Sequence, residues 1–195
     1  MSGPIAPRLR RMPWWLWTSG AVIAATGIVA ALGGFAEVPV QQLPELRLGE
    51  EHVGNEITTV VDGVVLSRER PSSEYDDEEH DYVVVNLTVT NSTTTPTLFL
   101  SNSVRIVLGD VVDEFTAPDG ATDPRNGTQV QFLQPGLPTE VAMSWQVTRG
   151  DVAVGDDIRI GVFERYDAPE DPRYRDAKTA PVVVAKLDTT VGEAP

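Results

Sequence analysis

Two hydrophobic patterns divide this chain. The residues from Met12 to Ala36 carry no charge and are mostly apolar, whereas after about residue 56 apolar and polar residues alternate. A run of about 20 apolar residues is long enough to cross the hydrocarbon core of a bilayer as a helix. Alternation with period two is typical of strands that bury one face. The sequence therefore predicts one transmembrane helix at 13–36, followed by a β domain.

Charges on either side of the predicted helix indicate its orientation. Arg8, Arg10 and Arg11 precede it, and Glu37 and Glu45 follow it before the next basic residue. Because positively charged flanks stay in the cytoplasm, we expect residues 1–12 to be cytoplasmic. The rest of the chain is then held outside the plasma membrane by a single-pass anchor.

The same segment shares features with a signal peptide, so two interpretations stay open. Signal peptides have a basic start, an apolar core of roughly 7–15 residues and small residues before the cleavage point. Residues 34–36 meet the last requirement, but the apolar run here is longer. Trp14, Trp15 and Trp17 lie where indole rings settle at the headgroup level. We therefore expect a retained anchor, with a cleaved and secreted protein as the alternative.

Small residues recur along the predicted helix at a spacing that places them on one face. Such faces let helix backbones approach closely within a bilayer. The pattern favours docking against another membrane helix, although a segment this rich in glycine and alanine also shows such a face by chance. The residues of this small-residue face are Gly20, Ala24, Gly27, Ala31 and Gly34.

The alternation after residue 56 predicts about eight short strands and no further helix. The clearest strand is Tyr82–Thr90, in which apolar residues face one side and polar residues the other. Asp62 and Gly63 interrupt the first strand and predict a bulge. Many short strands with frequent turn signals favour an antiparallel β-sandwich. The predicted strands are 57–66, 82–90, 104–108, 111–115, 129–133, 139–147, 158–163 and 182–187, with 97–100 as a further short candidate.

Segments without clear alternation flank the predicted domain. Residues 37–55 contain Pro39, Pro44, Gly49 and Gly54 with scattered charge, which is typical of an extended linker. We expect the domain to occupy residues 56–188 and residues 189–195 to form a C-terminal tail.

Composition narrows the classes of function. The chain has a net charge of −14, and the three N-terminal arginines are the only charged residues before Glu37, so the remainder carries −17. So acidic a domain repels phosphate backbones, which argues against a nucleic-acid partner. The chain has no cysteine, so the domain is stable without disulfides, and lipid attachment at an N-terminal cysteine is excluded.

Three segments together resemble a known family. Val83–Asn91 matches its "vvvnvtvtN" strand, Leu133–Gly136 matches its "lqPG" turn, and Val141–Val147 matches its strand ending in an aromatic residue, any residue and valine. The family comprises the immunoglobulin-like extracytoplasmic domains of bacterial lipoproteins and secreted proteins, among them the secreted mycobacterial immunoprotective antigen. The resemblance implies an antiparallel immunoglobulin-like β-sandwich with no shared catalytic residues. The chain departs from many relatives by its transmembrane anchor, where they carry a cleaved or lipidated signal.

Catalytic chemistry has no candidate in this sequence. The chain has two histidines, His52 and His80, and no cysteine, and it contains no G-x-S-x-G, H-E-x-x-H or P-loop motif. Because no nucleophile, base and orienting group can be assigned, we expect a protein that is not an enzyme and uses no cofactor.

An acidic segment, Glu74–Asp81, holds six carboxylates in eight residues. Crowded carboxylates attract Ca²⁺ or Mg²⁺, which take oxygen ligands. The spacing lacks the order of an EF-hand loop, and charge runs are usually solvated surface. We therefore expect no metal site here, and keep Ca²⁺ binding as an alternative. Its candidate ligands are Asp76, Asp77, Glu78 and Glu79.

A long connection between the last two predicted strands, 164–178, mixes arginine, tyrosine and proline. Arginine and tyrosine are favoured at the centres of protein interfaces, so this connection is a candidate contact with a partner. A crossover whose arginines pair with neighbouring aspartates fits the pattern equally well. The candidate contact residues are Arg165, Tyr166, Arg173, Tyr174 and Arg175.

These observations favour a non-enzymatic, membrane-anchored extracytoplasmic binding or accessory protein. Its expected partner is another membrane or envelope protein, such as a transporter, against which the small-residue face packs. Two alternatives stay open: a cleaved, secreted immunoglobulin-like protein of the antigen type, and a module that responds to divalent cations.

Overall fold

The computed structural model describes residues 42–69, 71, 79–108, 112–166 and 179–194. The chain divides into two units, Met1–Gln42 and Leu43–Pro195, and the fold is that of the second unit. The predicted helix 13–36, with its tryptophans and small-residue face, lies outside the described residues. Within the described ranges, no helix has the length and apolar character that crossing a membrane requires.

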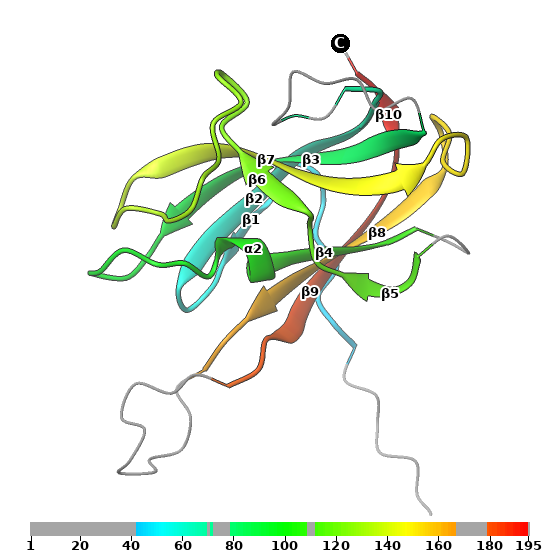
Figure 1. Ribbon diagram of the computed structural model, residues 1–195. Coiled ribbons are helices and arrows are strands. Elements are labelled where there is room, and N and C mark those ends of the chain that lie inside the picture. The colour runs from blue at the N-terminus through cyan, green and yellow to red at the C-terminus, as the bar shows by residue number, and fades with distance from the viewer. Residues whose placement is uncertain (1–41, 70, 72–78, 109–111, 167–178, 195) are drawn as a thin grey trace, which may run out of the picture. The chain divides into compact units, whose positions relative to one another are not determined.

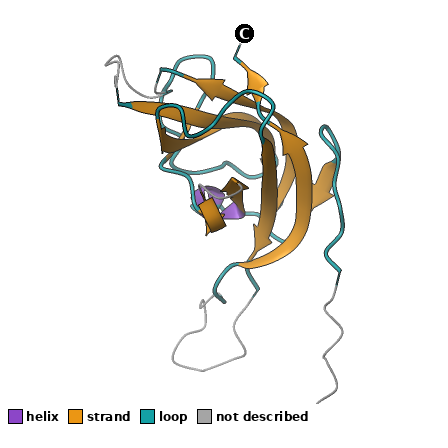
Figure 2. Ribbon diagram, turned by 90° about the vertical axis from the view of Figure 1, so that its right-hand side faces the viewer, coloured by secondary structure: helices purple, strands orange, loops and turns teal. Residues whose placement is uncertain are grey.

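The described residues of the second unit form ten strands in two sheets (Figures 1 and 2). Neighbouring strands are antiparallel throughout, except that β10 runs parallel to β2. A short helix, α2 (Leu100–Ser103), leads into the second sheet. The first sheet has the order β1 (Glu51–Val53), β2 (Ile57–Ser67), β3 (His80–Asn91), β7 (Pro138–Thr148) and β6 (Gly120–Thr122), with β10 (Gly192–Glu193) beside β2; the second has the order β5 (Val112–Thr116), β4 (Val104–Leu108), β8 (Asp157–Glu164) and β9 (Val182–Thr190). The predicted mainly antiparallel β-sandwich is therefore confirmed.

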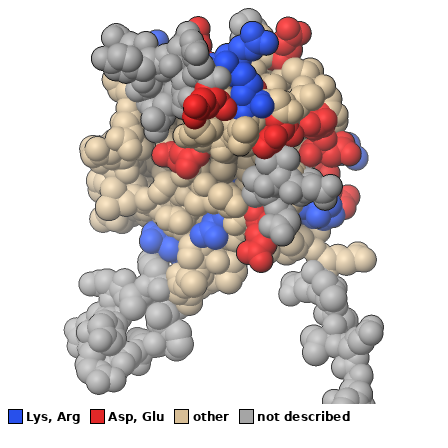
Figure 3. All heavy atoms as spheres, turned by 45° about the vertical axis from the view of Figure 1, so that its right-hand side comes forward, with Lys and Arg blue, Asp and Glu red and all other residues tan. Residues whose placement is uncertain are grey.

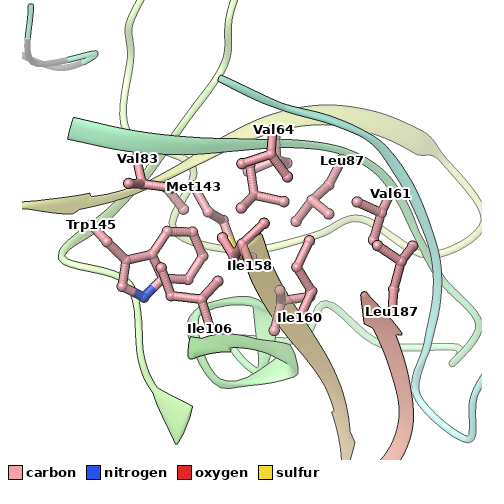
Figure 4. Packing of buried hydrophobic residues seen from close by; sticks show 14 of the residues in the cluster. Val61, Val64, Val83, Leu87, Ile106, Met143, Trp145, Ile158, Ile160 and Leu187 are labelled. Carbon is pink, nitrogen blue, oxygen red and sulfur yellow. The ribbon is translucent and has the colours of Figure 1, made fainter. Parts of the chain in front are cut away.

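The core lies between the two sheets (Figure 4). Alternate residues of β3 and β7 point inward in register, so that Val85 lies opposite Met143 and Val83 opposite Trp145, all buried. Ile106 and Ile160 cover them from the second sheet. Burying such a side chain stabilises the fold by roughly 1.5–3 kcal/mol each, so this alternation is the main reason the chain folds as it does.

A bulge in β2 keeps the apolar residues of this strand on the core side. The register with β3 shifts between Val61 and Gly63, as the sequence predicted, and Asp62 is the extra residue. Val61 and Val64, three positions apart, are both buried as a result. The hydroxyl of Thr88 donates to Asp62 at 2.9 Å on the outer face.

Two predicted strands, 97–100 and 129–133, are wrong. Only an isolated bridge joins Thr97 to Leu133, and Leu100 instead begins α2. The buried Asn91 amide donates to the carbonyls of Thr95 (2.7 Å) and Leu133 (2.9 Å). Such side-chain bonds to the backbone replace the ladder of a strand and fix a loop at the end of β3.

The domain also extends beyond its predicted boundaries. The segment 37–55 was predicted to be a linker, but the backbone N–H of Leu46 donates to the Lys186 carbonyl at 2.8 Å and residues 51–53 form β1. The tail 189–195 was predicted to lie outside the domain, but Val191 is buried and β10 pairs with β2. Both segments pair with open sheet edges, whose unpaired backbone groups favour such additions.

Candidate functional site

The strands of the sandwich begin and finish at two opposite ends of the domain. At one end β8 finishes at Glu164 opposite Val182, the first residue of β9. The turn from β1 to β2, the last residues of β3 and the start of β7 lie at the same end. We call this the β8–β9 end. The opposite end, where β2 finishes at Ser67 and β3 begins at His80, is called the β2–β3 end.

A histidine–carboxylate pair joins the two sheets at the β8–β9 end. His52 Nε2 of β1 lies 3.0 Å from Glu164 Oε1 of β8, and both side chains are mostly buried. The turn after β1 packs directly on this carboxylate. A Cβ at Gly54 would lie 2.8 Å from Glu164 Oε1 and 2.7 Å from the Ile57 carbonyl oxygen, so glycine is required there.

An arginine–carboxylate ion pair lies beside the histidine–carboxylate pair. The Arg165 guanidinium donates to Glu56 Oε2 from Nη2 at 2.6 Å and from Nε at 3.2 Å. Its Cζ lies 4.2 Å from the centre of the Phe99 ring, which is a cation–π contact. The side chain of Glu56 is only 9% exposed and that of Arg165 is 27% exposed. The charge of Glu56 is therefore held away from water by an arginine 109 residues further along the chain.

Tyr166 follows this cluster and is 45% exposed. Its backbone N–H donates to Thr179 Oγ1 at 3.0 Å, and the Thr179 N–H donates to the Tyr166 carbonyl at 2.9 Å. These two hydrogen bonds join the residues that follow β8 to the residues that precede β9. The negative charge of Glu164, with desolvation and a hydrogen bond to that carboxylate, raises the pKa of Tyr166 above its ordinary value of 10.0.

The structure describes two of the five predicted contact residues, and it gives them different roles. Arg165 is partly buried and binds Glu56, which is remote in sequence rather than a neighbouring aspartate. Tyr166 presents its ring to solvent on a fixed backbone. Arg173, Tyr174 and Arg175 lie outside the described residues.

Sequence reasoning missed three members of this cluster. His52 lies in the segment predicted to be a linker, and Glu56 and Phe99 carry no motif. Their partners are far away along the chain, so no local pattern could have found them.

The β2–β3 end carries a surface hollow of about 800 Å³. Asp81 lies at its wall, buried, and accepts bonds from Arg149 Nε at 3.2 Å and from the Gly150 N–H at 3.3 Å. Arg149 Nη2 also donates to the carbonyl of His80 at 3.2 Å. A hollow of this size suits a small ligand, but most of its lining residues are exposed. It is an open depression rather than an enclosed pocket.

The predicted cation ligands lie close to this end. Glu79 is exposed and directly precedes β3, whereas Asp76, Asp77 and Glu78 lie outside the described residues. Among the residues that the structure describes, no three histidine or carboxylate side chains are grouped so as to hold a metal ion.

Comparison with known proteins places the domain in the β-sandwich class. No family model matches the chain, and no curated protein matches it either. A solved structure of an uncharacterised β-sandwich protein from Clostridium difficile 630 matches with a TM-score of 0.51 at 9% identity, over 79% of this chain and 97% of that one. A candidate lipoprotein from Bacillus subtilis subsp. subtilis str. 168 matches with a TM-score of 0.42 at 14% identity, over 72% of this chain and 38% of that one. At such identities the first of these matches shows a shared fold alone.

Proposed function

We propose that this protein is a non-enzymatic, membrane-anchored extracytoplasmic binding or accessory protein. An N-terminal helix, 13–36, holds an immunoglobulin-like sandwich outside the plasma membrane, and the partner is another membrane or envelope protein such as a transporter. The resemblance of residues 82–147 to extracytoplasmic immunoglobulin-like domains supports this proposal. The two strand motifs of that family lie in β3 and β7, and its turn motif lies directly before β7.

The observation that carries the proposal is how the ionisable groups at the β8–β9 end are used. His52 binds Glu164 and Arg165 binds Glu56, and each pair connects residues from different elements. Side chains that bind one another and connect the two sheets are structural, and they leave a rigid surface on which Tyr166 is exposed. Exposed aromatic rings on a fixed backbone are frequent anchors in protein interfaces.

The N-terminal segment supplies the second half of the proposal. A helix face made of Gly20, Ala24, Gly27, Ala31 and Gly34 permits close packing with a partner helix inside the bilayer. Contacts in the bilayer and at the domain would then act together, since two linked contacts bind more tightly than either one alone.

A mild-detergent pull-down of the full-length native protein, with mass spectrometry of what is retained, tests this proposal. We expect a membrane protein in stoichiometric amount. Gly27→Leu with Ala31→Leu should reduce its recovery, and Tyr166→Ala should reduce it independently. Val154→Ala, an exposed residue at the β2–β3 end, is the control and should leave recovery unchanged.

Recovery of the protein alone, beginning near Glu37, would contradict the proposal and favour the cleaved, secreted form. Recovery of a partner that is indifferent to all three substitutions would keep the accessory role but reject both contact surfaces.

A further inference from the structure

The chain enters the domain at the β8–β9 end. Glu45 forms a parallel bridge with Lys186, flanked by hydrogen bonds from Leu46 N–H to the Lys186 carbonyl and from Lys186 N–H to the Pro44 carbonyl. Residues 44–46 therefore run in the same direction as β9, from its first residues towards its last. Figures 1 and 2 show the first described residues and the facing ends of β8 and β9 at the lower side of the domain, opposite the C-terminus.

Exposed apolar side chains gather at this same end. Of the eight large hydrophobic residues that are exposed in the described ranges, six lie at the ends of strands, or in the loops beside them, at the β8–β9 end; Leu48 precedes β1, and Val154 lies at the opposite end. A surface apolar patch rimmed by polar groups marks an interaction site. The six residues are Val53, Leu98, Phe132, Leu137, Tyr166 and Val182.

Among the described residues, exposed acidic side chains are more numerous at the β2–β3 end. At the β8–β9 end the carboxylates of Glu56 and Glu164 are mostly buried and bound to cationic or imidazole groups. On the face drawn in Figure 3, most of the red acidic surface lies in the upper and right-hand parts, and the lower left is tan with two blue basic patches. The exposed carboxylates at the β2–β3 end are Glu69, Glu79, Asp151, Asp156, Asp157 and Glu193, whereas Glu45, Glu51 and Glu140 are the exposed ones towards the β8–β9 end among the residues that the structure describes.

The covalent chain limits how far this end can be from the bilayer. Six residues, 37–42, join the end of the predicted helix to the domain, and six fully extended residues span at most about 21 Å. This is less than the length of an eleven-residue strand such as β2. In an anchored chain, the point at which the chain enters the domain therefore lies within that distance of the end of the helix, whereas the β2–β3 end is not limited in this way.

We propose that the β8–β9 end faces the bilayer, and that the exposed valines Val53 and Val182 contact the lipid headgroup layer. This inference rests on the proposed anchor. It turns these two valines towards lipid, where they leave water, leaves Tyr166 to the proposed protein partner, and keeps the acidic β2–β3 end away from anionic headgroups. The hollow bounded by Asp81 and Arg149 then opens away from the membrane.

The absence of cysteine makes a direct test available, because any introduced thiol is unique. Val53→Cys, Val182→Cys and the control Val154→Cys replace three exposed valines by a side chain of similar size. Each full-length variant is labelled with a fluorophore and reconstituted in phosphatidylcholine–phosphatidylglycerol vesicles that contain a headgroup spin label. We expect loss of most fluorescence at positions 53 and 182 and little loss at 154.

Equal quenching at the three positions, or stronger quenching at 154, would overturn the orientation. A blue shift at 53 and 182 in native membranes, without quenching in the vesicles that contain labelled lipid, would assign these two residues to a protein partner and overturn the lipid contact. The anchor itself is checked first by sedimentation of the vesicles. A protein that does not sediment with them defeats the proposed function, whereas one that sediments without quenching defeats only the orientation.

Discussion

The ion pair between Arg165 and Glu56 gives the sharpest test of how the β8–β9 end is built. Arg165→Met keeps the length of the side chain but leaves the carboxylate of Glu56, 9% exposed, without its guanidinium. It also removes the cation from the Phe99 ring. Both losses act in the same direction, so we expect the substitution to destabilise the domain.

The magnitude follows from burial. Breaking a fully buried pair by removing one partner costs about 3–5 kcal/mol, and a cation–π contact at a partly exposed site contributes about 0.5–1 kcal/mol. Because Arg165 is 27% exposed, water reaches Glu56 once the guanidinium is gone. We therefore expect a net loss of about 2–3 kcal/mol, below the fully buried range. That loss corresponds to a fall in Tm of about 5–10 °C for a domain of this size.

The chain offers a matched control. Arg159 and Asp188 also form a close pair, with 2.7 Å between Nε and Oδ1, but their side chains are 52% and 48% exposed. An exposed pair contributes about 0–1 kcal/mol, so Arg159→Met should change stability little. Urea denaturation of the full-length protein in detergent, followed by circular dichroism, measures both. If Arg165→Met were no more destabilising than Arg159→Met, the assignment of Arg165 to a structural role would be wrong.

Three further predictions follow from single features. Gly54→Ala should lower the free energy of unfolding by about 1–3 kcal/mol, because its Cβ would overlap the Ile57 carbonyl and Glu164. Gly63→Ala is the control, because a Cβ at Gly63 would enter open space. Equal effects of the two substitutions would refute the packing argument. The pKa of the Tyr166 phenol, measured by an absorbance titration, should lie above the ordinary value for tyrosine, and Glu164→Gln should lower it. The stability that this phenol adds is therefore present below pH 10.0 and is lost as the pH rises through its folded-state pKa. An unchanged titration in the variant would contradict this. Millimolar Ca²⁺ should leave the Tm unchanged, and a rise that disappears when residues 76–79 become Asn and Gln would restore the cation-responsive alternative.

Periodicity predicted the long strands because burial imposes it. β3 and β7 each present four alternate apolar residues to the core over seven positions, so their pairing partners were not needed to find them. The bulge at Asp62 was also predictable, because the alternation of β2 changes phase there. Strands of two or three residues, such as β1, β6 and β10, are too short for any period to be visible.

Only those residues of the candidate site that lie in a segment of unusual composition could be predicted from the sequence. Arg165 and Tyr166 stood out in a connection rich in arginine and tyrosine, but their different exposures could not be read from that pattern. The partners that fix them, Glu56 and Phe99, come from other elements and meet Arg165 only after both sheets have formed. Likewise, the segment around Glu45 looked like a linker because its pairing with Lys186 is a property of the finished sheet edge.

Membrane retention of the intact chain is the claim on which the rest depends. The most direct measurement is the intact mass and N-terminus of the native protein in the membrane fraction, after peripheral proteins have been washed off. The account predicts a chain close to the full 21.1 kDa that remains in the membranes. A shorter chain beginning near Glu37 and found in the medium would contradict it, and would leave a secreted β-sandwich whose partners must be sought elsewhere.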